Sequence, residues 1–394
     1  MLAGCLMLML APGCAACGAR VSSAAVPRRA GQPSAYVANS GSGTVTPIRL
    51  ADGKAGQPII VAPGPEQVLI SPDGATAYVA GQRDRGIWPG PATLTVIGTA
   101  SNTMIKIMTM CPAASGDIPK MAVTPDGKTL YYLCPSANRV ILVRTAALTA
   151  GPAVSAGPYP DAIAITPDGK TAYVANAGST TVTPIATATG TPGTPIRVGL
   201  GPDAIAITPD GDAAYVVTTT GKVVSIATAT NSPGRPIRVP GAITVAITPD
   251  GATAYVLSKP SPDSEQGAVV PVRVATNTPG TPIRAGLSPE QIVITPDGQM
   301  AYVTNLGSGT VTPIRVAAGT AGAAIKVGKA PAHLAVTPDS ATVYVVNSNF
   351  YGLRFRSGRL IRLPGSVTPI RVATGTPGKP VTVGIAPLGI AIDP

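Results

Sequence analysis

A short motif recurs along nearly the whole chain and constrains the fold more than any other feature. Six Pro-Asp-Gly triplets, which begin at residues 72, 125, 167, 209, 249 and 296, each precede a tyrosine by a few residues. A seventh triplet, at 338–340, ends in serine. The tyrosines at 36, 78, 131, 173, 215, 255, 302 and 344 are separated by 42, 53, 42, 42, 40, 47 and 42 residues. A period near 42 that holds several short strands is typical of β-propeller blades, none of which can bury its faces alone.

One repeat, residues 161–200, divides into four predicted strands, which we label a to d from the channel outward. The alternation of branched apolar residues and the turn residues place strand a at 161–166, b at 171–176, c at 181–185 and d at 194–198. Pro167, Asp168 and Gly169 make the tight a–b turn, because proline presets φ and glycine accepts a positive φ.

Prolines indicate which strand lies at the edge of a blade. Proline cannot donate a ladder hydrogen bond, so Pro195 assigns strand d to the outer edge. Arg197 beside it would discourage pairing with another sheet. Pro184 falls in strand c, which should be internal, and this position requires a bulge.

The two ends of the repeat predict how the ring closes. There are eight tyrosine strands and only seven internal turn triplets, so one strand a is missing at the start. Residues 390–394 match strand a, and residues 34–39 match strand b. Pairing of these ends would complete one blade without a covalent link. We therefore predict an all-β chain forming a single propeller of four-stranded antiparallel blades, eight in number, with seven as the alternative if one irregular repeat is not a blade.

Composition agrees with a single closed ring. The 45 glycines and 43 prolines would indicate disorder without a period, but with one they supply the turns. Aromatic residues make up only 4%, so Val, Ile, Ala and the repeated Tyr must pack the core. The net charge of +11 favours acidic partners such as an anionic wall polymer or lipid headgroups. The alternative is a solvated basic rim that serves only solubility.

The first 25 residues lie outside the repeat and resemble an export signal. Residues 6–10 form an apolar stretch too short to span a membrane as a stable helix. The first basic residue is Arg20, whereas an export signal usually has one before its apolar stretch. Cys14 and Cys17 follow small residues and are candidate lipidation sites. We expect a leader at 1–25, a linker at 26–33, the propeller at 34–394, and an extracellular or cell-surface protein with a possible lipid anchor.

Two cysteines remain once the leader is removed, Cys111 and Cys134. A cysteine pair in an exported protein suggests a disulfide. The repeat register places Cys111 at the start of the d–a loop of the second blade and Cys134 at the end of strand b of the third. Both positions reach the same face, so a bridge is geometrically reasonable. Two buried free thiols are the alternative.

One of the repeated strings identifies a family resemblance. Residues Tyr302, Val303, Thr304 and Asn305 spell the string that names the YVTN β-propeller repeat family, and residues 36–39, 173–176 and 344–347 are close variants. Residues 33–394 resemble this family. The resemblance implies a bacterial or archaeal exported or surface protein. It implies little about chemistry, because propellers with unrelated functions share the fold.

Insertions into the repeat indicate where function lies. The longest are the b–c loops at 81–92, 259–268 and 348–364 and the d–a loop at 111–120. In a propeller these connections share one face, and loops on a rigid scaffold commonly carry binding sites. Aromatic and arginine residues gather in them, and the candidate binding residues are Arg83, Arg85, Trp88, Phe350, Tyr351, Arg354, Phe355, Arg356 and Arg359.

Such residues can stack on sugars and pair with carboxylate or phosphate groups. We therefore predict a binding scaffold for a macromolecule, glycan or anionic surface polymer. The alternative is a loop folded onto the ring, where its phenylalanines cover apolar surface. Export and the shortness of the cluster argue against nucleic acid as the partner.

A second set of polar residues is predicted at the channel mouth. Glu66, Asp161, Asp203 and Glu290 each lie six residues before a turn proline, and His333 lies at the start of another strand a. These acids could hold a cation, or they could satisfy backbone donors. A lactonase-like hydrolase or a lyase using the acids and His333 is the alternative function. The sequence has no catalytic triad motif, no histidine-rich metal set and no phosphate-binding loop, so we expect no cofactor. We also expect the protein to be a monomer.

Overall fold

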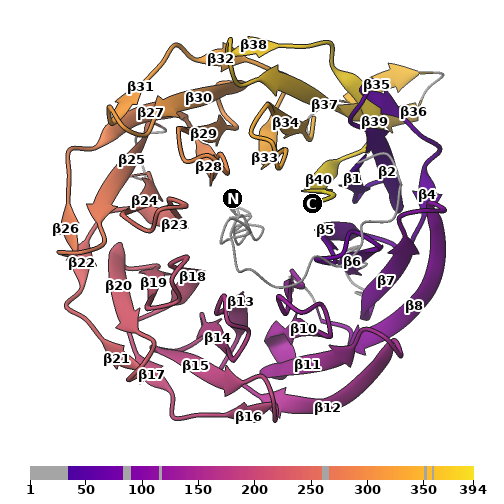
Figure 1. The fold of residues 1–394 in the computed structure, drawn as a ribbon. Coiled ribbons are helices and arrows are strands. Elements are labelled where there is room, and N and C mark those ends of the chain that lie inside the picture. The colour runs from indigo at the N-terminus through magenta and orange to yellow at the C-terminus, as the bar shows by residue number, and fades with distance from the viewer. Residues whose placement is uncertain (1–33, 83–89, 115–117, 260–265, 350–352, 357–358) are drawn as a thin grey trace.

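Eight sheets surround a central axis in the computed structural model of the protein (Figure 1). The structure describes residues 34–394 except 83–89, 115–117, 260–265, 350–352 and 357–358, and for 353–356 and 359–361 it describes the backbone alone. Each sheet is one antiparallel blade, and the prediction of eight blades is confirmed. Within these residues the one helical element is the 3₁₀ turn η1 (Pro135–Ala137).

Blades are numbered from blade 1, which contains the first described strand. In order from blade 1, strands a are β40 (Pro387–Ile392), β5 (Pro65–Ile70), β9 (Met121–Val123), β13 (Pro160–Ile165), β18 (Pro202–Ile207), β23 (Ala242–Ile247), β28 (Pro289–Ile294) and β33 (Pro331–Val336). Strands b are β1 (Ser34–Asn39), β6 (Thr76–Gln82), β10 (Thr129–Cys134), β14 (Thr171–Asn176), β19 (Ala213–Thr218), β24 (Thr253–Ser258), β29 (Met300–Asn305) and β34 (Thr342–Asn347). Strands c are β2 (Thr44–Arg49), β7 (Ala92–Gly98), β11 (Arg139–Arg144), β15 (Thr181–Ala186), β20 (Lys222–Ala227), β25 (Gln266–Arg273), β30 (Thr310–Arg315) and β37 (Pro364–Arg371).

Strand d is continuous only in blades 2 and 3, as β8 (Thr103–Cys111) and β12 (Thr149–Ser155). Elsewhere it has two short parts, which are β3 (Lys54–Ala55) with β4 (Ile59–Ile60), β16 (Thr191–Pro192) with β17 (Ile196–Arg197), β21 (Ser232–Pro233) with β22 (Ile237–Arg238), β26 (Thr278–Pro279) with β27 (Ile283–Leu287), β31 (Thr320–Ala321) with β32 (Ile325–Lys326), and β38 (Thr376–Pro377) with β39 (Val381–Ile385). Of the strand d expected at 194–198, residues Ile196–Arg197 pair as β17, and β16 at Thr191–Pro192 lies before the expected strand.

The interruption of strand d explains the prolines inside strand c. Pro184 lies opposite Tyr173 of strand b, and its carbonyl accepts the N–H of Gly193 on the strand d side at 2.8 Å. The N–H that Pro184 lacks would point to the same side, because N–H and C=O of one strand residue share a direction. Strand d breaks at that point, so no ladder donor is missed. A Cβ on Gly193 would lie 3.3 Å from the Pro184 ring, which explains why glycine faces proline there.

The ends of the chain close the ring as predicted. β40 pairs with β1 in antiparallel register, with Tyr36 opposite Ala391 and Val37 opposite Ile390 (Figure 1). Gly389 lies at the seam between blades 1 and 2. A Cβ on Gly389 would lie 2.3 Å from the Glu66 carbonyl oxygen, so the two inner strands approach closely only because this residue has no side chain.

In several blades the repeated tyrosine joins the blade to the next one. The Tyr173 hydroxyl donates to Asn231 Oδ1 in the c–d turn of the following blade at 2.7 Å. Asn231 itself has a positive φ of 54°. Two other such pairs are Tyr36 with Asn102 (2.8 Å) and Tyr215 with Asn277 (2.6 Å). A buried hydroxyl needs such a partner. The tyrosine period therefore follows from contacts between blades as well as from burial.

The Tyr302 hydroxyl is buried without a hydrogen-bond partner among the described residues, and the corresponding position of the next turn is Gly375 (φ 64°). We expect Gly375→Asn to stabilise the fold by about 1 kcal/mol, because it supplies the missing acceptor. Asparagine tolerates positive φ, and the nearest atom to the new Cβ would be 3.8 Å away. Thermal unfolding of a double-mutant cycle with Tyr302→Phe checks this. An equal gain in the phenylalanine background would contradict the explanation.

Candidate functional site

The strand order sorts the connections onto two faces. The b–c and d–a connections form one face, which we call the insertion face, and the a–b and c–d turns form the opposite turn face. All four long connections, 83–91, 112–120, 259–265 and 348–363, belong to the insertion face. On the turn face, the Pro-Asp-Gly acids are structural. For example, the Thr166 hydroxyl donates to Asp168 and lowers the pKa of that carboxyl.

In four blades, a buried asparagine at the end of strand b forms hydrogen bonds that hold a loop of the insertion face in place. Asn176 Nδ2 donates to the Thr183 hydroxyl of strand c at 2.9 Å, and its Oδ1 accepts the N–H of Gly157 in the d–a loop at 3.0 Å. Asn39, Asn305 and Asn347 make the same two contacts. The last residue of the Tyr-Val-x-Asn string therefore holds the loops of the insertion face, a role that strand patterns alone did not predict.

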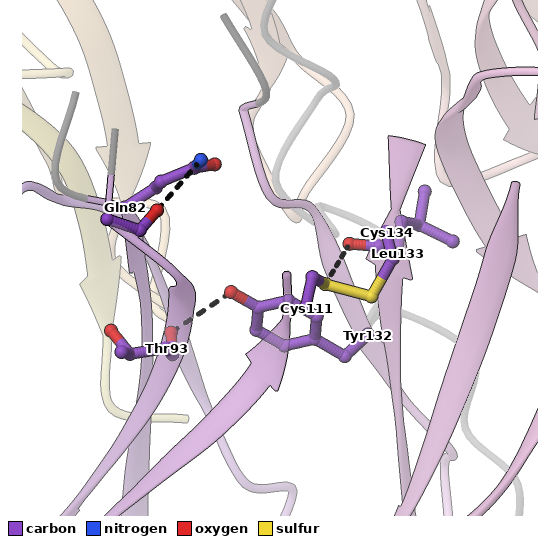
Figure 2. The surroundings of a disulfide bond; sticks show 7 residues. Gln82, Thr93, Cys111, Tyr132, Leu133 and Cys134 are labelled. Carbon is purple, nitrogen blue, oxygen red and sulfur yellow. Dashed lines mark hydrogen bonds between the residues drawn. A yellow bond between two sulfur atoms is a disulfide. The ribbon is translucent and has the colours of Figure 1, made fainter. Parts of the chain in front are cut away.

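Cys111 and Cys134 form a disulfide with a Cα–Cα distance of 5.6 Å (Figure 2), which confirms the prediction. Cys111 ends β8 of blade 2 and Cys134 ends β10 of blade 3, so the bridge joins neighbouring blades at the insertion face. Nearby, the Tyr132 hydroxyl of blade 3 donates to the Thr93 carbonyl of blade 2 at 3.0 Å (Figure 2). Disulfides are typical of oxidising compartments. No helix of the described part of the chain is long and apolar enough to cross a membrane.

The candidate binding residues fall into two groups. Arg83, Arg85, Trp88, Phe350 and Tyr351, like the lipidation candidates Cys14 and Cys17, lie outside the described residues. Arg354, Phe355, Arg356 and Arg359 lie on an added hairpin of β35 (Leu353–Arg356) and β36 (Arg359–Arg362).

The hairpin register pairs Arg356 with Arg359 and Arg354 with Ile361. Alternate residues of a strand belong to the same face, so Arg354, Arg356 and Arg359 occupy one face of the hairpin. The hairpin is an insertion between strands b and c of blade 8. The backbone therefore places three of the predicted arginines together on the insertion face.

Basic residues outnumber acids strongly in blades 7 and 8. Between Asp297 and Asp393 the only acid is Asp339, which lies in an a–b turn on the turn face. The same stretch holds nine basic residues. Six of them belong to the insertion face by their place in the blade, namely Lys326, Lys329, Arg354, Arg356, Arg359 and Arg362. Blade 7 adds one acid to the insertion face, Glu290 at the channel mouth, whose pKa is raised to about 7. The basic residues therefore leave this sector of the insertion face with a net positive charge.

The channel-mouth acids lie on β-bulges. Asp161 and Asp203 are the second residues of β13 and β18, and the pairing register shifts at each of them. The same holds for Glu66, while Glu290 lies in a longer register shift. A bulge re-aims a side chain at the start of a strand. The four acids therefore share one structural position, as the sequence predicted.

The structure brings only some of these acids together. Asp203 forms a side-chain hydrogen bond with Asp161 of the neighbouring blade, so one of the two carboxyls must carry the proton. Burial and the charge of Asp161 raise the pKa of Asp203 to about 7. Burial likewise raises the pKa of Glu290 to about 7, but the charged neighbour that opposes this shift is Lys259.

Lys120 is a channel-mouth residue that the sequence pattern did not reveal. Its side chain is only 2% exposed. Burial lowers the pKa of Lys120, whereas the charges of Asp161, Asp203 and Glu66 act in the opposite direction. Lys120 immediately precedes β9, the shortest inner strand. This repeat has no acid at the position that the channel-mouth acids occupy in their own repeats. A search for acids at a repeated position of the sequence cannot find a lysine that lies near them on another blade.

His333 is a bridge between blades. Burial lowers the pKa of its imidazole to about 4, and the imidazole hydrogen-bonds to the backbone of Leu388 in the next inner strand. The corresponding residue of β5, Gln67, accepts the N–H of Met121 in the next blade at 2.6 Å. Gln291 of β28 does the same for Leu334 at 2.8 Å. His333 therefore occupies a position that other blades use for structural bridging.

The pKa of Asp203 predicts how stability depends on pH. Its pKa is about 7 in the fold and about 3.9 in an unfolded chain, so the folded chain binds this proton more tightly. The contribution to stability is fully present below about pH 3.9 and is lost as pH rises through about 7. The substitution Asp203→Asn would keep a donor to Asp161 without a charge. We therefore expect this variant to melt above the wild type at pH 8, with a difference that shrinks toward pH 4. A lower melting temperature at pH 8 would contradict this.

No three His, Cys, Asp or Glu side chains of the described part of the chain are arranged to hold a metal ion. The buried set Asp161, Asp203 and Lys120 can instead share protons or accept a cationic group beside the carboxyl pair.

Comparison with known proteins identifies the fold alone. No protein-family model and no curated protein matches the chain. Among solved structures, hydrazine synthase of Kuenenia stuttgartiensis is 21% identical with a TM-score of 0.59, over 79% of this chain and 96% of that one. The dihydro-heme d1 dehydrogenase NirN, in complex with DHE, is 14% identical with a TM-score of 0.72, over 94% and 78%. Apo AztD from Citrobacter koseri is 14% identical with a TM-score of 0.63, over 91% and 97%. At these identities, the likeness shows that the chain shares the propeller fold with these proteins. It does not show a shared activity.

Proposed function

We propose that the protein is a binding scaffold that holds a polyanionic macromolecule on the insertion face above blades 7 and 8. The observation that carries this proposal is the separation of charge. Six basic residues of that sector belong to the insertion face against one acid, Glu290 at the channel mouth, and the other two acids, Asp297 and Asp339, belong to the turn face. A surface of one sign attracts ligands of the opposite sign and raises their association rate. Arginine in particular pairs with carboxylate, sulfate and phosphate groups through two parallel hydrogen bonds.

The rigid ring supports this reading. The contacts of Asn305 and Asn347 fix the d–a connections that lead into blades 7 and 8, so a ligand would meet a preorganised surface. We also propose, from the Tyr-Val-x-Asn strings, that the chain is a YVTN-repeat propeller that is exported and acts at the cell surface. The disulfide supports an oxidising location. Candidate ligands are acidic glycans and anionic surface polymers.

The experiment compares two variants that remove the same number of charges. In the first, Arg354, Arg356, Arg359 and Arg362 of the hairpin become glutamine. In the second, the same change is made at the ends of strands c on the turn face, at Arg144, Arg273, Arg315 and Arg371, which are all exposed. Binding of dextran sulfate and of polyglutamate is measured by fluorescence anisotropy over a series of salt concentrations.

We expect the hairpin variant to lose about tenfold or more in affinity, equivalent to about 1.4 kcal/mol. The turn-face variant should differ from the wild type by much less, and the salt dependence should be weaker only for the hairpin variant. Equal losses in the two variants would mean that net charge alone attracts the polymer, and the proposal would then be wrong.

A hydrolase or lyase acting at the channel mouth is the second candidate, and the Asp161–Asp203 pair favours it. A carboxyl with a pKa of about 7, hydrogen-bonded to a second carboxyl, can donate and accept protons near neutral pH. His333 supports it less, because its imidazole bonds to the backbone. Lactone hydrolysis that disappears in Asp161→Asn, with unchanged melting, would favour this enzyme.

A further inference from the structure

A pocket of about 500 Å³ lies between blades 7 and 8 on the insertion face. Two turns line it, the b–c turn at 306–309 and the d–a connection at 326–330, together with Asn349 at the base of the added hairpin. Both lysines of the pocket, Lys326 and Lys329, are exposed. Neither forms an ion pair with any residue that the structure describes. The pocket therefore combines a concave shape with two uncompensated positive charges.

The lysine at position 329 distinguishes this pocket from the other blade junctions. The equivalent d–a positions, two residues before the first residue of the next strand a, are Pro63, Pro119, Pro158, Leu200, Pro240, Leu287 and Ile385. These residues are all apolar, and the two leucines are 60% and 38% exposed. A long side chain at this position thus reaches solvent without a packing role. Lys329 stands where the other junctions have an apolar residue. At this one junction, the preceding strand, β32, also ends in a lysine, and the b–c connection that follows carries the basic hairpin.

The pocket is continuous with the hairpin. Asn349 lines the pocket, and its Nδ2 donates to the Pro364 carbonyl at 3.2 Å, which ties together the two ends of the hairpin insertion. A chain of acidic groups lying along the hairpin would therefore reach the pocket. The Ser308 hydroxyl, which shares a 2.8 Å contact with the Thr310 hydroxyl, adds a polar group to the lining.

We propose that this pocket is a binding site for a single oxyanion group, such as phosphate, sulfate or carboxylate, held by Lys326 and Lys329. The inference rests on the proposed function in one respect, because the group would belong to the polyanion bound along the hairpin. The pocket would then select polymers with a terminal or branching acidic group, while the hairpin arginines supply general attraction.

The test uses inorganic phosphate, sulfate and acetate with the full chain, at ionic strength held constant with sodium chloride. Binding is followed by isothermal titration calorimetry and by the shift in melting temperature. The pocket variant combines Lys326→Gln with Lys329→Leu. The leucine at position 329 is the residue type found in other d–a connections, so the variant should fold normally. Lys222→Gln with Lys379→Gln, at exposed positions outside the pocket, is the control of equal charge.

We expect saturable binding of at least one anion by the wild type and the control, with at least a tenfold loss of affinity in the pocket variant. The order of the three anions identifies the group that the pocket prefers. The hairpin variant described above should lose affinity for the polymer and still bind the small anion. A wild-type protein that bound the small anion but no polymer would overturn the proposed function and leave the pocket intact. An absence of saturable binding, or equal affinity in the pocket variant and the control, would overturn the pocket proposal.

Discussion

Deletion of Pro387–Pro394 is expected to leave a chain that forms no stable ring. These residues include β40, which is strand a of blade 1 and pairs with β1. Without it, the inner edge of β1 exposes unpaired backbone groups, and Leu388 no longer covers apolar surface at the seam. Burial of one large apolar side chain contributes about 1.5–3 kcal/mol, and the deletion removes several together with a whole strand ladder. Circular dichroism and size-exclusion chromatography should show loss of cooperative melting and association into larger species.

Deletion of Asp393 and Pro394 alone is the matched control. It keeps β40 whole and removes one backbone hydrogen bond, from Asp393 N–H to the Ser34 carbonyl at 3.0 Å. We expect only a small decrease in melting temperature. If the longer deletion melted cooperatively near the wild-type temperature, terminal closure would not hold the ring together.

A point substitution tests the same seam without removing a strand. Gly389→Ala would place a Cβ 2.3 Å from the Glu66 carbonyl oxygen, so the inner strands of blades 1 and 2 would have to separate. Overpacking of this kind costs about 1–3 kcal/mol. The result complements the deletion, because the alanine variant keeps every strand hydrogen-bonding group.

Removal of the Cys111–Cys134 disulfide is expected to lower the free energy of unfolding by about 3 kcal/mol, as the chain-entropy model gives for a loop of this length. The bridge joins blades 2 and 3, whose strands d are the only continuous ones, at the insertion face. The variant should carry alanine at both positions. The cysteines are 3% and 1% exposed, and serine would bury unpaired hydroxyls. Chemical unfolding monitored by fluorescence or circular dichroism measures the change.

Reduction of the wild type provides the control for this variant. Protein whose two thiols are shown by mass spectrometry to be free should unfold at nearly the same denaturant concentration as the double alanine variant. An unchanged midpoint after complete reduction would show that the ring, and not the bridge, holds these blades together.

Local features of the fold were predictable because the backbone responds to local sequence. The Pro-Asp-Gly turns, the strand period and the terminal match between residues 390–394 and 34–39 sufficed for eight blades and for their closure. The cysteine pair followed from the same register, since both residues end strands that reach one face. The break in strand d was not predicted, because it occurs at a glycine that faces the neighbouring strand c, opposite a proline in five of the six broken strands and opposite Ser225 in the sixth.

Apart from the disulfide, the contacts between blades were not predictable, since they join residues about forty or more positions apart. The partner of the Tyr173 hydroxyl is Asn231, which lies 58 residues further along the chain. Lys120 is near the acids of other blades, and His333 reaches the next inner strand, although neither fact has a local pattern. The amino-acid sequence by itself determined the number of blades, the face that carries the insertions and the clustering of basic residues near the C-terminus. Only the tertiary structure decided which acids share a proton, that the imidazole of His333 bonds to the next inner strand, and where a pocket opens beside the basic hairpin, because these depend on the distances between blades around the ring.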